Sequence, residues 1–228
     1  MPRVVLLHSA LGDSRLWRRQ VEALAASFEV VAPDLPGFGS VPMPTEPFSF
    51  VDAVVSELPG MLVGNSFGGM VALRTALAHP ELVSRLVLIA PGRRDFQWTD
   101  QLRDHFASEE AAIEAGDLVA ATEVNMEFWV APEHRDEVRP QQLRALQLQT
   151  AHAEPELVWP DEVALGDLDV PTLVIVGDQD KADFRKIAEQ LAAEIPAAEL
   201  EVVEGAGHLV GLDRPAELNA LLLEFLAG

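Results

Sequence analysis

Residues Leu62 to Met70 read Leu-Val-Gly-Asn-Ser-Phe-Gly-Gly-Met, and this stretch decides the fold. The apolar residues before Gly64 predict the end of a buried strand, and apolar residues at helical spacing after Met70 predict a helix. Ser66 is therefore expected in a tight strand-to-helix turn, with a glycine two residues away on each side. A side chain at either flanking position would collide with the backbone, so Gly64 and Gly68 supply the room that the turn requires.

Short apolar runs alternate with helical patterns along most of the remaining chain. A run that is apolar throughout is typical of a strand covered on both faces, and strands that alternate with helices predict a parallel sheet. The predicted strands are residues 3–8, 28–32, 61–63, 85–90, 171–177 and 200–204. The predicted fold class is α/β, with a doubly wound, mainly parallel six-stranded sheet and helices on both faces.

Residues 93–160 interrupt this alternation. The segment contains no convincing strand, and its apolar residues recur at helical spacing. An insertion of helices between two core strands is expected to form a small helical lid over the strand ends. We therefore divide the chain into a first core part at 1–92, which carries the Ser66 turn, the lid at 93–160, and a second core part at 161–228.

The charge and composition of the chain exclude several classes of partner and chemistry. Its 228 residues include 37 acidic and 16 basic side chains, a formal net charge of −21. Nucleic acids and anionic membranes bind positive surface, so neither is an expected partner. The absence of cysteine rules out disulfides and a cysteine nucleophile. The first apolar run, residues 4–7, is too short for a signal peptide or a membrane span, so a cytoplasmic protein is expected.

Five landmarks follow one another along the sequence. They are His-Ser-Ala-Leu-Gly at 8–12, Asp-Leu-Pro-Gly-Phe-Gly-Ser at 34–40, the turn at 64–69, Gly-Asp-Gln-Asp at 177–180 and Gly-Ala-Gly-His at 205–208. In this order they resemble the α/β-hydrolase fold family, in which Gly-x-Ser-x-Gly is the nucleophile elbow and the catalytic residues run Ser, Asp, His. The resemblance covers nearly the whole chain and implies the strand order 2-1-3-4-5-6.

The resemblance implies three catalytic side chains. Ser66 is the expected nucleophile, His208 the base that activates its hydroxyl, and Asp180 the acid that orients the imidazole. Asp178 is the alternative acid because it comes directly after the strand, although the family pattern favours Asp180. The other histidines in helical or lid segments are expected to have surface or capping roles; they are His79, His105, His134 and His152.

The implied oxyanion hole uses two backbone N–H groups. Phe67, directly after the serine, is expected to supply one, and Ala10, in the loop after the first strand, the other. The family usually has His-Gly in this loop, whereas Ser9 follows His8 here. We expect His8 to brace the loop by hydrogen bonding rather than to react.

No metal or cofactor is expected. Three closely spaced aspartates, Asp178, Asp180 and Asp183, could indicate a calcium loop, but the central glycine and the closing glutamate of such loops are missing. Asp183 also stands near the place where the family often has a proline.

The lid is expected to set the substrate, which is a small molecule. Its apolar candidates for lining a pocket are Trp98, Phe106, Met126, Phe128 and Trp129. Trp129 and Met126 are the expected substrate contacts among these, with packing of the lid on the core as the alternative. Arg93, followed by Arg94, is a candidate partner for a substrate carboxylate, or else part of an ordinary surface pair.

The expected reaction is hydrolysis of a small ester or lactone through an acyl-enzyme. Asn65 keeps a second reaction open, because Gly-Asn-Ser-Phe-Gly-Gly is similar to the elbow of hydrolases that cleave carbon–carbon bonds in ring-cleavage products of aromatic compounds. Residues 8–17 are instead similar to enol-lactonases. A non-catalytic binding module on the same scaffold is the third alternative.

The chain also departs from the family pattern at its beginning. Family members usually carry a β-hairpin before the first parallel strand, and this chain starts almost directly at that strand. A compact member without the hairpin would expose one edge of the sheet. A second copy of the chain could cover this edge, so a homo-oligomer is one expectation for the protein in solution.

Overall fold

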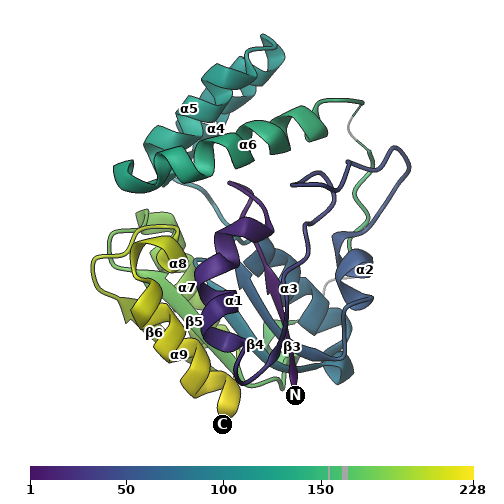
Figure 1. The fold of residues 1–228 in the computed structure, drawn as a ribbon, viewed down its shortest axis with the longest axis vertical. Helices are drawn as coiled ribbons and strands as arrows, with labels where there is room; N and C mark the ends of the chain where they lie inside the picture. Colours follow the sequence, from purple (N-terminus) through teal and green to yellow (C-terminus); the bar gives the residue numbers. More distant parts are fainter. Residues whose placement is uncertain (154, 161–163) are drawn as a thin grey trace.

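The protein is described here by a computed structural model that covers residues 1–153, 155–160 and 164–228. Its centre is a six-stranded sheet in the order β2-β1-β3-β4-β5-β6, and every neighbouring pair of strands is parallel (Figure 1). The predicted fold class and strand order are therefore confirmed. The strands are β1 (Arg3–Leu7), β2 (Glu29–Val31), β3 (Gly60–Asn65), β4 (Val83–Ile89), β5 (Thr172–Gly177) and β6 (Ala198–Val203).

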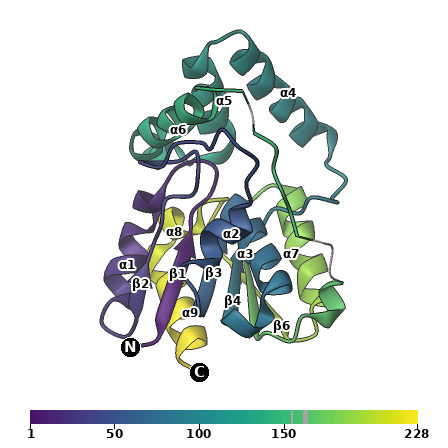
Figure 2. The same ribbon diagram turned by 90° about the vertical axis from the view of Figure 1, so that its right-hand side faces the viewer.

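Helices cover both faces of the sheet (Figure 2). Val5 and Leu7 of β1 join the core against α2, α3 and α7, whereas Val4 and Leu6 join the core against α1, α8 and α9. Burial on both faces explains why the strands have continuous apolar sequences. These helices are α1 (Arg18–Leu24), α2 (Phe50–Val55), α3 (Phe67–Ala78), α7 (Ala182–Glu194), α8 (Val210–Asp213) and α9 (Pro215–Ala227).

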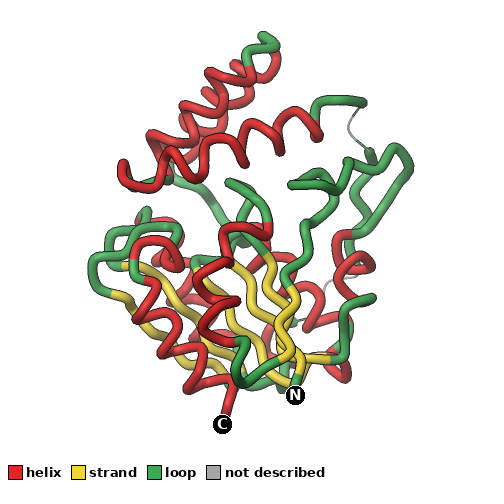
Figure 3. Tube along the Cα trace, viewed as in Figure 1, coloured by secondary structure: helices red, strands yellow, loops and turns green. Residues whose placement is uncertain are grey.

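Three further helices, which we call the cap helices, lie beyond one end of the sheet (Figures 1 and 3). They are α4 (Asp100–Glu114), α5 (Leu118–Trp129) and α6 (Arg135–Gln149). Asp117 is the N-terminal capping residue of α5, because its side chain accepts a hydrogen bond from the backbone N–H of Ala120 (2.9 Å). The cap helices lie at the carboxyl ends of the strands, because α5 and α6 pack against residues of the loops that follow β1 and β6.

A buried apolar cluster attaches the cap helices to the core. It joins α5 and α6 to the loop after β1 and to the segment that follows His208. Its members are Leu11, Leu16, Met126, Val130, Val138, Leu209 and Leu212. Burial of this size ties α5 and α6 firmly to the core, because each fully buried aliphatic side chain contributes about 1.5–3 kcal/mol.

The described residues between 93 and 160 contain no strand, and their single sheet-like contact is an isolated bridge between Phe48 and Leu157. The division into two core parts and a lid remains our interpretation. Its second boundary, at 160 and 161, adjoins residues 161–163, which lie outside the described residues. None of the helices in the described ranges is long and apolar enough to cross a membrane.

Candidate active site

The turn between β3 and α3 holds Ser66 in an unusual backbone conformation. Its φ is 54° and its ψ is −113°, a region that a residue with a side chain enters only at a cost in strain. A Cβ atom on Gly64 would overlap the carbonyl oxygen of Gly68, and one on Gly68 would overlap that of Leu7. The expected need for glycine on both sides of the serine is therefore confirmed.

Ser66, Asp180 and His208 converge at the carboxyl ends of the strands. Ser66 follows β3, Asp180 follows β5, and His208 follows β6. The Nε2 atom of His208 lies 2.8 Å from Ser66 Oγ, and its Nδ1 atom lies 3.0 Å from Asp180 Oδ2 and 3.2 Å from Oδ1. An imidazole that donates from Nδ1 to the carboxylate keeps Nε2 free to accept the serine proton.

Asp178, the alternative acid, points elsewhere. It is exposed, and its Oδ1 accepts a hydrogen bond from the N–H of Gly205 (2.7 Å). Asp183 accepts from both the N–H and the hydroxyl of Thr99 (2.8 Å each), which ties the start of the cap to α7. The three aspartates therefore bind separate partners, and the described part of the chain offers no group of three His, Cys, Asp or Glu side chains placed to hold a metal ion.

Two aromatic rings hold the imidazole of His208. The ring centroid of Phe184 lies 4.4 Å from that of His208, and the centroid of Trp129 lies 4.6 Å from it. Trp129 is in turn fixed by its Nε1–H, which donates to His105 Nε2 (2.8 Å). The imidazole therefore sits between two aromatic rings, one of which, Trp129, is itself held by a hydrogen bond.

His105 is buried, so the surface or capping role expected for it is wrong. It is 6% exposed and stacks on Phe128 with the ring centroids 4.0 Å apart. Burial lowers the pKa of His105 to about 4, so the ring is neutral at neutral pH and its Nε2 can accept from Trp129.

The two proposed oxyanion donors lie beside the serine. Phe67 and Ala10 line the same cavity as Ser66, and in the described residues neither backbone N–H has a hydrogen-bond acceptor. His8 braces the Ala10 loop as expected. Its Nε2 accepts from the N–H of Leu35 (3.0 Å), so its Nδ1–H donates to Ser9 O (2.9 Å), and burial lowers its pKa.

A cavity of about 310 Å³ opens between the elbow and the cap helices. Trp129 lines it as expected, whereas Met126 does not: it is fully buried in the cluster that attaches the cap, so its expected substrate contact is wrong. The cavity is lined by Ser66 and His208, by the apolar residues Leu11, Phe67, Met70, Trp98, Phe106, Trp129 and Phe184, and by Glu109, Asn125 and Gln142 among others.

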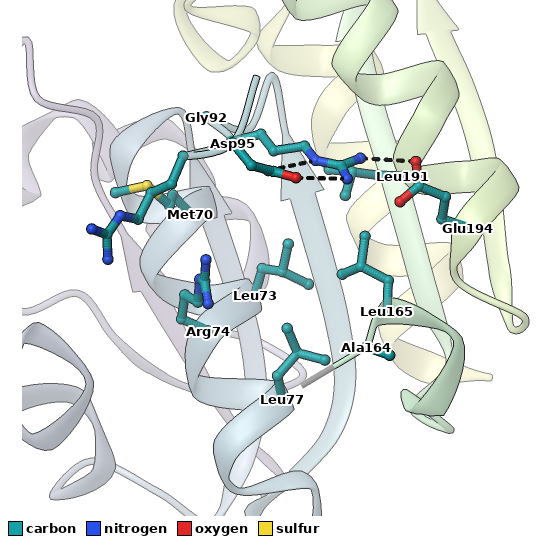
Figure 4. A pocket seen from close by; sticks show the side chains of 12 residues that line it. Met70, Leu73, Arg74, Leu77, Gly92, Asp95, Ala164, Leu165, Leu191 and Glu194 are labelled. Atoms are coloured by element: carbon teal, nitrogen blue, oxygen red, sulfur yellow. Dashed lines mark hydrogen bonds and ion pairs between the residues drawn. The ribbon is translucent and has the colours of Figure 1, made fainter. Parts of the chain in front are cut away.

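Arg93 borders the cavity, but its guanidinium is already paired. Its Nε lies 2.8 Å from Asp95 Oδ1 and its Nη1 lies 2.9 Å from Glu194 Oε1. Figure 4 draws these ion pairs as dashed lines that end at Asp95 and Glu194. Both carboxylates raise the pKa of Arg93. These pairs lie in a second, neighbouring cavity of about 220 Å³. Arg94 packs over the ring of Trp159 at 5.2 Å. The expected role of Arg93 in binding a substrate carboxylate therefore competes with two ion pairs.

Three polar residues in the cavity wall were not singled out from the sequence. Glu109, Asn125 and Gln142 come from α4, α5 and α6, one from each helix. A signal was present for one of them. Leu102, Phe106 and Glu109 share one face of α4 at helical spacing, so a carboxylate follows two apolar residues on that face.

Comparison with known proteins agrees with this fold. Residues 4–221 match the model of the Alpha/beta hydrolase family. A pimeloyl-[acyl-carrier protein] methyl ester esterase of Aromatoleum aromaticum is 31% identical, covering 100% of this chain and 99% of its own. A 2-hydroxymuconate semialdehyde hydrolase of a Pseudomonas strain is 30% identical, covering 92% of this chain and 81% of its own. The solved enol-lactonase of Burkholderia xenovorans LB400 has the same fold, with a TM-score of 0.79 at 20% identity over 100% of this chain and 92% of its own.

Proposed function

This chain belongs to the alpha/beta hydrolase family, and we propose that it is a serine hydrolase that cleaves a small carboxylic ester or lactone through an acyl-enzyme. The observation that carries the proposal is the 2.8 Å distance between Ser66 Oγ and His208 Nε2, with Asp180 against the opposite side of the imidazole. A serine hydroxyl alone is a weak nucleophile at neutral pH and requires such a base.

The first half of the proposed reaction forms the acyl-enzyme. Ser66 Oγ attacks the substrate carbonyl carbon while its proton passes to His208 Nε2, which leaves a tetrahedral intermediate with a negative oxygen. The N–H groups of Phe67 and Ala10 stabilise that oxygen. His208 then returns the proton to the leaving alcohol oxygen as the carbon–oxygen bond breaks, and Asp180 stabilises the imidazolium in between.

The second half releases the acid. Water attacks the acyl carbonyl carbon, and His208 accepts one of its protons. The second tetrahedral intermediate collapses, the bond to Ser66 Oγ breaks, and His208 gives its proton back to the serine. The same two N–H groups and the same carboxylate act in both halves, so no further catalytic residue is required.

The cavity supports a small, mainly apolar substrate. Its volume of about 310 Å³ lies at the lower end of the range for small-molecule sites, and most of its lining is aromatic or aliphatic. Trp129 and Phe184 occupy the wall next to His208. We therefore expect short or medium acyl chains to be preferred over long ones.

Carbon–carbon bond hydrolysis is the second candidate. It is favoured by the 30% identity with the 2-hydroxymuconate semialdehyde hydrolase. Asn65 does not decide between the two, because its side chain has a structural use under either reaction. Its Nδ2 donates to Ile89 O (2.9 Å) and to His208 O (3.3 Å), which holds the His208 loop against the end of β4.

A substrate panel tests the proposal. Wild-type protein is assayed against p-nitrophenyl esters of increasing acyl length, simple lactones and a vinylogous diketo acid. We expect turnover of short esters or lactones and a loss of kcat on the order of 10⁴- to 10⁶-fold in Ser66→Ala. Ser56→Ala, which removes an exposed hydroxyl remote from the site, is the matched control.

If only the diketo acid is turned over, carbon–carbon bond hydrolysis replaces ester or lactone hydrolysis as the proposed function. A folded protein that turns over none of these compounds would favour a binding module.

A further inference from the structure

A hydrogen-bonded chain of three polar side chains crosses the wall of the mainly apolar cavity. Asn125 Nδ2 donates to Glu109 Oε1 (2.6 Å). The side-chain amide of Gln142 is oriented so that both its oxygen and its nitrogen have partners. In this orientation Gln142 Oε1 accepts the second N–H of Asn125 (2.9 Å), and Gln142 Nε2 donates to Ala10 O (2.8 Å) and Leu11 O (3.2 Å). The chain therefore runs from α4 to the loop that carries a proposed oxyanion donor.

Asn125 and Gln142 have no N–H donor left for a ligand. They are 2% and 4% exposed, and both N–H bonds of each amide are used within the chain. Their hydrogen bonds hold the carboxylate of Glu109 in place.

Glu109 is different, because half of its carboxylate is unused. Oε1 accepts from Asn125, whereas Oε2 has no hydrogen-bond or ion-pair partner among the residues that the structure describes, and the side chain lines the cavity. Burial raises the pKa of Glu109. A carboxylate oxygen that faces a mainly apolar cavity is stabilised by a donor, and Ser66 lines the same cavity, so the free Oε2 indicates a place for a substrate group.

The nearby cations do not fill this place. Arg93 is paired with Asp95 and Glu194. Arg94 lies over the ring of Trp159 at 5.2 Å, and Lys181 lies over the ring of Phe128 at 4.2 Å. An incoming donor would therefore meet a carboxylate that no described side chain has neutralised.

We propose that Glu109 is a specificity-determining residue: its free oxygen accepts a hydrogen bond from a hydroxyl or ammonium group on the acyl part of the substrate, and it rejects acyl groups that end in a carboxylate. The inference rests on the proposed function and narrows its substrate class. We assign Glu109 to the acyl part for two reasons. Gln142 links the wall that holds Glu109 to the Ala10 loop, which in the proposed reaction faces the carbonyl oxygen. The leaving group is protonated by His208, which is flanked instead by Trp129 and Phe184.

Four matched esters test this assignment. They are the p-nitrophenyl esters of hexanoic, 6-hydroxyhexanoic and 6-aminohexanoic acid and the p-nitrophenyl monoester of adipic acid. We expect wild-type kcat/KM to be about tenfold higher for the hydroxyl or the ammonium ester than for the hexanoate, and about tenfold lower for the adipate. The two donor-bearing esters distinguish recognition of a hydroxyl from recognition of a cation.

Glu109→Gln should reverse the preference. Its amide can still accept from Asn125 while presenting an N–H to the cavity, so kcat/KM for the adipate ester should gain at least about tenfold relative to the hexanoate, mostly through KM. Glu110→Gln makes the same change in net charge on an exposed neighbour and should leave all ratios unchanged.

Unchanged ratios in Glu109→Gln, or an equal shift in Glu110→Gln, would overturn the inference while leaving the proposed function intact. If Glu109→Gln fails to fold, the wild type alone decides: an adipate ester cleaved as well as the hexanoate overturns the inference. A folded wild type that cleaves none of the four esters and does not react with a fluorophosphonate overturns the proposed function and this inference with it.

Discussion

The core loops that carry Ser66, Asp180 and His208 differ from the cap helices in what fixes their geometry. Ser66 is held by the backbone, through a positive φ and two glycines whose neighbours leave no space for a Cβ atom. The cap wall is held by side chains, through the bonds from Asn125 to Glu109 and from Trp129 to His105. A single substitution can therefore alter the cap wall with little effect on the reacting atoms.

The two regions touch at two points that matter for the reaction. Trp129 of α5 packs on His208, and Gln142 of α6 donates to Ala10 O. The first contact restrains the base and the second restrains a proposed oxyanion donor. Away from these two contacts, the comparison separates two kinds of experiment: changes in the core loops should reduce kcat, whereas changes in the cap should affect substrate choice or stability.

The largest expected effect belongs to the core loops. Asp180→Asn removes the carboxylate that holds the Nδ1–H tautomer of His208 and stabilises its cation, so kcat for a short ester should fall on the order of 10³- to 10⁴-fold. The measurement is steady-state hydrolysis of a p-nitrophenyl ester, with circular dichroism to check the fold.

Asp178→Asn is the matched control, because the same change occurs two residues away on a carboxylate bonded to Gly205. It should change kcat by no more than about threefold. A larger loss in Asp178→Asn than in Asp180→Asn would show that the acid has been assigned to the wrong aspartate.

A smaller effect, on stability, is expected from the cap. His105 has a pKa of about 4 in the folded protein and an ordinary value of 6.5, so the unfolded chain binds the proton more readily between these values. The contribution of His105 to the free energy of unfolding is therefore complete above pH 6.5 and is lost as the pH falls towards 4. The loss over this range amounts to about 3 kcal/mol.

Urea unfolding at pH 7 and pH 4 measures this contribution. The fall in unfolding free energy between the two pH values should be about 3 kcal/mol smaller in His105→Gln than in the wild type, whereas His152→Gln, at an exposed histidine, should match the wild type. Equal falls in all three proteins would mean that the cap does not hold His105 neutral.

The contrast between the two regions also explains what could be predicted from the sequence. Backbone constraints leave local traces, because only glycine fits at Gly64 and Gly68 and only apolar runs fill a strand buried on both faces. The parallel sheet and the Ser66 turn followed from such traces. The resemblance carried by the five landmarks implied the strand order and the convergence of Ser66, Asp180 and His208, with Asp180 rather than Asp178 against the imidazole.

Side-chain constraints between helices leave weaker traces. Met126 and Trp129 are three residues apart on α5, yet one packs in the core and the other lines the cavity, because the orientation of the helix decides which face meets the elbow. Glu109 and His105 each depend on partners from another helix, Asn125 and Trp129. No single stretch of sequence contains both members of such a pair.

Covalent labelling of the serine tests the central claim most directly. Wild-type protein is incubated with a fluorophosphonate, and the adduct is counted by intact-mass measurement and located by peptide mapping. We expect one phosphonyl group per chain, on Ser66, and no adduct in Ser66→Ala. A folded wild type that stays unmodified, or that carries the adduct on another residue, would contradict the account.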